Sequence, residues 1–411
     1  MRILIFTILL LTADNAVAQV DQQRAAEYFR EAAALCELEG GKLWGTSLCG
    51  PMVFADPATG TIATSQPAPA APRPPYLGFA NAALEWGGTR WSTIVWPMIA
   101  PMDKQTRATL MIHELFHRIQ PDLGLMTVGA SNDHLDTLDG RYWIQLEWRA
   151  LSKALRSSGE DRASALNDAL AFRATRRKLF PGSAEKERAD ELREGLAQFT
   201  AISVSSSDTS AAAINEMAKA AGNPTYMATF GYASGAAYSV LLNAFSPGWT
   251  RRLKSTDDLG DLVTAAAGIT ASANVDAAAK SYGGDELKAA EEKRDAEQKA
   301  RIAELRKRFI DGPVLILPGV RSSSSTTIGR TAIPGAGIVY PMFRTSAEWG
   351  TLEASSVLIP EDRSKVIVPA PPSIEGPTIK GDGWTLTPAP GWIIRPGARS
   401  GDFQLVREQR R

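Results

Sequence analysis

The sequence predicts an α+β fold in which a mainly helical core follows a small N-terminal sheet and precedes a C-terminal all-β module. Segments with apolar residues at helical spacing dominate from about residue 103 to residue 309. Short β-rich runs fall between residues 43 and 64 and again after residue 312, where Pro, Gly and Ser separate them. At 411 residues the chain is long enough for two or three such domains.

The N-terminus has the features of an export signal. Arg2 is followed by the apolar run 3–11 and by Ala16-Val17-Ala18, which predicts cleavage before Gln19 and a signal peptide over residues 1–18. No other stretch approaches the roughly 20 apolar residues of a membrane span, so no integral membrane segment is expected after cleavage. We expect a periplasmic or extracellular protein.

The charge balance excludes whole classes of partner. Lys+Arg and Asp+Glu each total 45, so the net charge is zero. A neutral chain gives no electrostatic reason to expect nucleic acid or an anionic membrane surface as a partner. Composition does not indicate an oligomeric state.

The two cysteines, Cys36 and Cys49, are predicted to pair, because export places them in an oxidising compartment. Closing so short a loop would add about 3 kcal/mol in the chain-entropy model. The alternative is a pair of free, buried thiols.

The N-terminal region, residues 19–75, is predicted to contain a helix over 21–38, short strands over 43–64 and a Pro-rich linker over 66–75. A further strand is predicted over 91–96. Such a strand either forms the edge of a substrate cleft or is an ordinary core strand.

Residues 76–283 are expected to form the main domain. A helix should begin near Asp103, a good N-cap, and end before Pro121. Caps and breakers then delimit further helices over 139–155, 161–180, 184–204, 211–221 and 226–245. A charged connector helix over 284–311 and a β module over 312–411, which has no catalytic cluster, complete the chain.

Two of the three histidines, His113 and His117, stand four positions apart on the helix that follows Asp103. One turn apart, they share a face and can bind one cation. Glu114 lies between them, as in the H-E-x-x-H arrangement that binds zinc and uses the glutamate as a general base. We expect one Zn²⁺ per chain rather than a coincidental motif.

A catalytic zinc has three protein ligands and an open position. The third histidine of a metzincin would fall at Leu123, so that option fails. Glu194 is the preferred third ligand, because Gly195 and Ala197 beside it would let its helix approach closely. Glu147, which Arg149 could compensate as a structural ion pair, is one alternative.

His134, on the loop after Pro121, is the other alternative for the third ligand.

The segments HELFHRIQ (113–120) and ELREGLAQF (191–199) resemble the gluzincin branch of zinc metallopeptidases, of the peptidase-MA-like kind. The resemblance covers about residues 91–245. It implies zinc ligands at both motif histidines and at Glu194, with Glu114 as the base. Glu194 follows His117 by 77 positions (194 − 117), longer than is usual in that family, so the helices between would be an insertion.

The resemblance also suggests roles for residues around the metal. Gln198 stands where such enzymes often carry an acid that orients the first histidine, and it can still accept an imidazole N–H. Residues 230–238 are similar to the pattern that supplies a catalytic tyrosine in aminopeptidase-type gluzincins. That match makes Tyr232 the expected oxyanion donor, with Tyr238 second.

The resemblance implies a zinc-dependent metallopeptidase with a peptide or protein substrate, and the N-terminal signal predicts that it is exported. An alternative is a cell-envelope binding protein that binds zinc without proteolysis. A third possibility is hydrolysis of a non-peptide amide bond. The presence of Glu114 favours an enzyme, because a structural zinc needs no general base.

Overall fold

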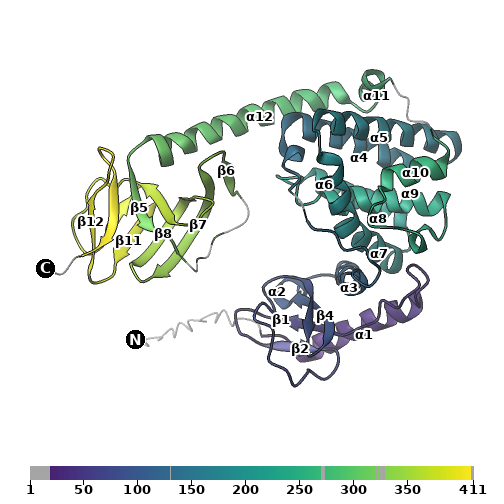
Figure 1. Ribbon diagram of the computed structural model, residues 1–411, viewed down its shortest axis with the longest axis horizontal. Helices are drawn as coiled ribbons and strands as arrows, with labels where there is room; N and C mark the ends of the chain where they lie inside the picture. The colour runs from purple at the N-terminus through teal and green to yellow at the C-terminus, as the bar shows by residue number, and fades with distance from the viewer. Residues whose placement is uncertain are drawn as a thin grey trace, which may run out of the picture. The chain divides into compact units, whose positions relative to one another are not determined.

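The computed structural model describes residues 19–129, 131–269, 274–320, 323, 325 and 329–408. Helices dominate the first part of the chain and strands the last, which confirms the predicted α+β class (Figure 1). The chain separates into two compact units, with the boundary between Ala289 and Ala290. The predicted signal peptide, residues 1–18, lies outside the described residues.

The first unit begins with α1 (Gln22–Glu39) and a small sheet. The Asp21 side chain caps α1 by accepting hydrogen bonds from the backbone N–H groups of Gln23 and Arg24. Gly40, at φ 60°, ends the helix in the left-handed conformation that glycine adopts readily. The four strands are β1 (Met52–Ala55), β2 (Ile62–Thr64), β3 (Ala82–Trp86) and β4 (Thr89–Val95).

The strand order of this sheet is β2-β1-β4-β3, with β1 and β4 parallel and the other neighbours antiparallel. Strand β4 covers most of the predicted strand 91–96 and has partners on both sides. It is therefore a core strand and not the edge of a cleft. The buried Ser92 hydroxyl donates a 2.9 Å hydrogen bond to the backbone carbonyl of Glu114, which ties β4 to the motif helix.

That helix, α3 (Lys104–Ile119), follows the short α2 (Trp96–Ile99). Asp103 caps it as predicted, since its carboxylate accepts the Thr106 backbone N–H at 3.0 Å. The helix ends before Pro121, also as predicted. Its buried side chains join the main hydrophobic core of the unit.

The remaining helices of this unit follow α3 in the chain, and α7 packs directly against it. The α-helices are α4 (Leu138–Arg156), α5 (Gly159–Leu179), α6 (Ser183–Asp190), α7 (Leu196–Ser205), α8 (Thr209–Ala221), α9 (Ala236–Phe245), α10 (Leu259–Ala267) and α11 (Val275–Ser281). Short 3₁₀ or π turns are η1 (Asp133–Asp136), η2 (Glu191–Gly195), η3 (Gly231–Gly235) and η4 (Trp249–Arg251). Helices α4 and α5 pack side by side (Figure 1). None of the described helices combines the length and hydropathy needed to cross a bilayer.

A buried ion network joins α4, α5 and α6. Arg176 is fully buried and binds both Glu147 of α4 and Glu187 of α6, with its Nε and Nη2 at 2.8 and 3.0 Å from the Glu187 oxygens. The predicted ion pair between Glu147 and Arg149 is wrong. Arg149 is exposed and donates instead to backbone carbonyls of residues 282–283, because it lies on the opposite face of α4.

Arg173 extends this network to the turn that carries Glu194. Its two Nη atoms lie 2.7 and 2.6 Å from the oxygens of Glu191, and Nη2 lies 3.2 Å from Asp258. Arg177 binds Asp258 as well, at 2.9 Å. Burial by itself would raise the pKa of Asp258, but the two arginines hold it well below the ordinary range.

The second unit is a β module. The charged helix α12 (Gly284–Arg306), which contains the boundary between the units, and the turn η5 (Lys307–Asp311) lead to it. Its strands are β5 (Val314–Pro318), β6 (Thr331–Ile333), β7 (Gly337–Ala347), β8 (Gly350–Ile359), β9 (Lys365–Pro369), β10 (Ile379–Gly381), β11 (Trp384–Pro388), β12 (Trp392–Pro396) and β13 (Phe403–Arg407). They form one nine-stranded sheet of order β10-β11-β8-β9-β5-β13-β12, with β7 also on β8 and β6 on β7.

The Asp258 ion pairs predict a specific acid sensitivity. A carboxyl whose pKa is lower in the folded than in the unfolded state stabilises the fold above its unfolded-state pKa of about 3.9, and this stabilisation is lost as the pH falls below it. The Asp258→Asn side chain can still cap α10, but it loses the stabilisation that the ionised carboxylate provides. Its free energy of unfolding should be lower at neutral pH and should fall less steeply between about pH 6 and pH 3.

Urea unfolding over that pH range measures the effect. The matched control is Asp257→Asn, since the Asp257 carboxylate accepts a hydrogen bond from the Lys254 backbone N–H and forms no ion pair with the described arginines. An identical pH slope in wild type and Asp258→Asn would contradict the assignment.

Candidate metal centre

His113 and His117 lie one turn apart on the buried side of α3, where Ile112 and Phe116 hold the helix in the core. Their Nε2 atoms are 3.0 Å apart. Glu194, from η2, faces them and places its Oε2 3.3 Å from His113 Nε2 and 3.4 Å from His117 Nε2. The structure therefore brings together the three residues predicted as metal ligands.

The three donor atoms have the spacing that a small tetrahedral cation requires. At metal–ligand distances of about 2.0–2.1 Å, tetrahedral geometry separates neighbouring ligand atoms by about 3.3–3.4 Å. Glu194 Oε2 is buried and accepts no hydrogen bond of normal geometry among the described residues. Within the described part of the chain, these three residues are the one His/Cys/Asp/Glu group spaced to hold a metal ion.

The carboxamide of Gln120 fixes the tautomer of His117. Gln120 Nε2 donates to the carbonyls of Leu192, at 2.9 Å, and Arg193, at 3.2 Å, so its Oε1 faces the imidazole. His117 Nδ1 lies 2.9 Å from that oxygen and must carry the proton, which leaves the Nε2 lone pair for a metal. The sequence pattern contained Gln120 but assigned it no role.

Gln198 orients His113 as predicted. Its Oε1 lies 3.2 Å from His113 Nδ1, so this imidazole also directs its Nε2 toward Glu194. A neutral amide raises the basicity of the imidazole less than a carboxylate would.

Glu194 is held through its second oxygen. Arg193 places Nη1 2.6 Å from Glu194 Oε1 and Nη2 2.8 Å from Asp190 Oδ1. With Oε1 bound to Arg193, Glu194 can offer a metal one oxygen, Oε2. Burial by itself would raise the pKa of Glu194, but hydrogen bonds and charge from the two histidines in their protonated form hold it well below the ordinary range, and a bound cation acts in the same direction.

Glu194 sits in a π-helical turn, η2, that packs directly against a second one, η3. A Cβ on Gly195 would lie 2.5 Å from Gly235 Cα, and a Cβ on Gly235 would lie 2.9 Å from the Glu191 carbonyl oxygen. Backbone touches backbone here, which explains the glycines. The expected close approach at Gly195 is confirmed, whereas the π turns, which often mark functional sites, carried no sequence signal.

The contact between η2 and η3 places Tyr232, which lies in η3, beside the predicted metal ligands. Its ring stacks on His113, with centroids 5.4 Å apart and an interplanar angle of 7°. Burial, followed by the charge of Glu194, raises the pKa of Tyr232, so the phenol stays protonated and can donate. The prediction of Tyr238 as the second candidate for the oxyanion donor is wrong. Its side chain is fully buried and donates to Glu147 Oε1 at 2.7 Å.

Glu114 is buried beside the ligands, and its Oε2 has no hydrogen-bond partner among the described residues. Burial raises the pKa of Glu114, and the nearby histidines offset part of that rise. A buried carboxylate oxygen with a free lone pair beside a cation site is suited to accept a proton.

The ligands, Glu114 and Tyr232 open onto a cleft of about 670 Å³. Its walls are mixed, because α3, α8 and the segments beside them contribute both apolar and polar side chains. The apolar part comprises Met98, Met102, Leu110, Ile202, Ala211 and Ala212. The polar part includes Asn81, Gln105, Thr106, Thr109, Asp208, Asn215, Glu216 and Lys219.

Neither alternative third ligand reaches the site. His134 Nε2 lies 2.9 Å from Glu187 Oε1 and so belongs to the ion network. Glu147 is fully buried in the same network, bound to Arg176. Both residues therefore have structural partners in place of a metal.

Known proteins add no independent assignment. No family model, no curated protein and no solved structure matches the chain. The interpretation of the site rests on its residues and their geometry.

Substituting Glu194 and Glu147 one at a time tests which of them is the third metal ligand. Glu194→Ala should lower zinc affinity by orders of magnitude, because two histidines alone coordinate the ion weakly. Glu147→Ala should keep the metal and lose about 3–5 kcal/mol of stability, because buried Arg176 loses a partner. Zinc competition titrations and urea unfolding measure the two effects, and the reverse pattern would move the third ligand to α4.

The contact between η2 and η3 predicts that Gly195→Ala destabilises the fold by about 1–3 kcal/mol, since the added methyl group meets the backbone of Gly235. Gly222→Ala is the control. Gly222 has ordinary helical φ, and its nearest neighbouring atom is 3.5 Å from the added carbon. Equal unfolding free energies for the two variants would show that the turns have room to separate.

Proposed function

We propose that the chain is an exported zinc-dependent metallopeptidase. The observation that carries the proposal is the position of Glu114, a buried carboxylate with an unpartnered oxygen, beside the converging donor atoms of His113, His117 and Glu194. A structural zinc is normally enclosed by four protein ligands, whereas a catalytic zinc has three protein ligands and a base beside its open position.

When bound, zinc supplies a Lewis acid that polarises a carbonyl and lowers the pKa of water. The residues of the chain supply the rest. Glu114 Oε2 accepts a proton from the attacking water and returns it to the leaving amine nitrogen. The Tyr232 hydroxyl donates a hydrogen bond to the oxyanion that develops on the former carbonyl.

The resemblance of residues 113–120 and 191–199 to gluzincins supports the same reaction class. The long spacing between the two segments is taken up by α4 and α5, with α6 leading into η2. The buried ion network gives this hairpin a structural role, because Arg173 reaches from α5 to Glu191 in the turn that holds Glu194.

Export is inferred from residues 1–18 and fits the pairing of Cys36 with Cys49, which are disulfide-bonded as predicted. A periplasmic or extracellular location follows from this inference. Peptides and proteins are the proposed substrates, since an extended chain can occupy an open cleft with both apolar and polar walls.

Glu114→Gln tests the mechanism. The amide keeps the shape of the side chain but is not a base, so the variant should bind zinc normally and lose about 10²–10⁴-fold in peptide hydrolysis. Cleavage of a quenched fluorescent peptide library, with and without a chelator, measures the loss.

The matched control is Glu216→Gln, which also neutralises a carboxylate lining the cleft but one that is paired with Lys219. It should retain hydrolysis within a few fold. Full activity in Glu114→Gln would refute the general base. A zinc-loaded wild type that cleaves no peptide would favour the binding protein instead.

A further inference from the structure

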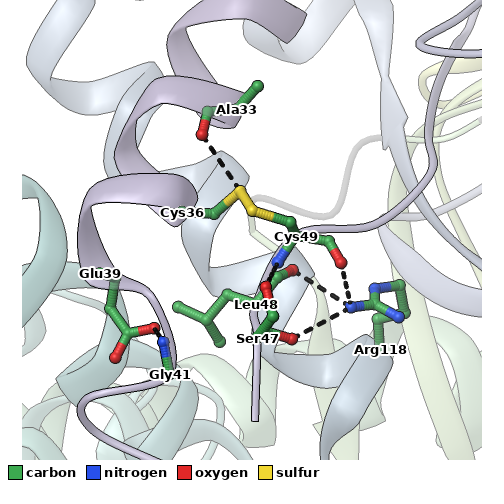
Figure 2. Close-up of a disulfide and its surroundings, with 8 residues drawn as sticks. All are labelled: Ala33, Cys36, Glu39, Gly41, Ser47, Leu48, Cys49 and Arg118. Atoms are coloured by element: carbon green, nitrogen blue, oxygen red, sulfur yellow. Dashed lines mark hydrogen bonds between the residues drawn. A yellow bond between two sulfur atoms is a disulfide. The ribbon is translucent and has the colours of Figure 1, made fainter.

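Arg118, the residue after the ligand His117, binds the loop that joins α1 to β1. Its Nη2 lies 2.7 Å from the carbonyl oxygen of Cys49, 3.2 Å from that of Leu48 and 3.5 Å from that of Ser47 (Figure 2). Arg118 makes no ion pair with any described carboxylate. Its charge is therefore directed to backbone oxygens, and such charge-assisted hydrogen bonds are stronger than neutral ones.

The loop that accepts these hydrogen bonds is itself fixed. Cys49 is covalently joined to Cys36 on α1, whose side chain is buried. Leu48 is completely buried in the main core, the same cluster that contains Phe116 of α3. The disulfide and the Leu48 side chain hold the three carbonyls in the positions that Arg118 requires.

Gly50 also packs directly against the Arg118 guanidinium. A Cβ on Gly50 would lie 2.1 Å from Arg118 Nε and 2.3 Å from its Cζ, so the guanidinium occupies the space that a side chain would need. Arg118 is thus enclosed between the loop backbone and α3. A methyl group at residue 50 would displace it without altering the disulfide or the arginine itself.

We propose that the disulfide-bonded loop and Arg118 act as one brace that positions the last turn of α3, and with it His117, for the metal. The proposal rests on the zinc site proposed above. Arg118 is a positioning residue, because it touches the ligand helix and not the metal. Cys36–Cys49 then has a second role besides stabilising the fold, since it keeps the carbonyls in place for the arginine.

The chain offers a matched control for this brace. Arg251, from η4, donates its Nη2 to the carbonyl oxygens of Gly41 and Lys42, each at 3.0 Å, in the same loop. It binds the loop as Arg118 does but is not attached to α3. Arg251→Met should therefore lower stability without changing the metal site, whereas Arg118→Met should change both.

The test is Co²⁺ and Zn²⁺ affinity by chelator competition, together with the visible d–d spectrum of bound Co²⁺, measured on full-length folded protein. Arg118→Met, Gly50→Ala and the double variant Cys36→Ser/Cys49→Ser should each weaken metal binding about tenfold and shift the spectrum. Arg118→Lys should recover part of the loss. Combining Arg118→Met with the cysteine pair should cost no more than the larger single loss.

Unchanged affinity and spectrum in Arg118→Met and Gly50→Ala would overturn the brace, even if the cysteine variant fails to fold. So would an equal affinity loss in Arg251→Met, or losses that add fully in the combined variant. A wild-type protein that binds neither ion would instead reject the zinc site and this proposal with it. The two failures are therefore distinguishable.

Discussion

Two imidazole nitrogens and one carboxylate oxygen converge to within 3.4 Å of one another in a buried part of the first unit. Gln120 directs the proton of His117 to Nδ1, and Gln198 accepts at Nδ1 of His113, so both Nε2 lone pairs point inward. Electron-rich atoms placed this way repel one another unless a cation lies between them. Much of the surrounding structure serves to keep them together.

The fold meets this constraint from three directions. The sheet holds α3 through Ser92, and the α1–β1 loop holds it through Arg118. The α4–α5 hairpin holds the opposite side, where Arg173 grips Glu191 one turn before the glutamate ligand. The glycine contact between η2 and η3 then brings the Tyr232 ring against His113. The contacts of Ser92, Arg118 and Arg173 are polar and buried or partly buried, so they are directional in a way that apolar packing alone is not.

Local patterns in the sequence were enough to predict the motif helix, its Asp103 cap and the disulfide, because capping, helical periodicity and the export signal are short-range signals. Glu194 was found through its neighbours Gly195 and Ala197 and through the gluzincin resemblance. The partners of buried charges were not predictable. Arg149 is next but one to Glu147 in sequence, yet the true partner, Arg176, lies on another helix and faces it only after the hairpin packs.

Dependence on tertiary packing also explains why other features of the structure were not predicted from the sequence. Gln120 and Arg118 act through backbone carbonyl groups of residues 192–193 and 47–49, which only the tertiary fold places beside them. Strand β4 precedes the motif helix, as a cleft-edge strand would, but it has partners on both sides because β1 pairs with it in parallel and β3 in antiparallel. Strand β3 was not among the predicted strands, because it is short and is followed directly by Gly87 and Gly88, which weakens the strand signal.

X-ray absorption at the zinc edge, on protein purified without added metal and quantified for zinc, tests the central claim most directly. The site described here predicts one zinc per chain with two imidazole nitrogens and one or two oxygens at about 2.0–2.1 Å. A sulfur shell at about 2.3 Å, a shell of six oxygens, or the absence of zinc from folded protein would contradict it.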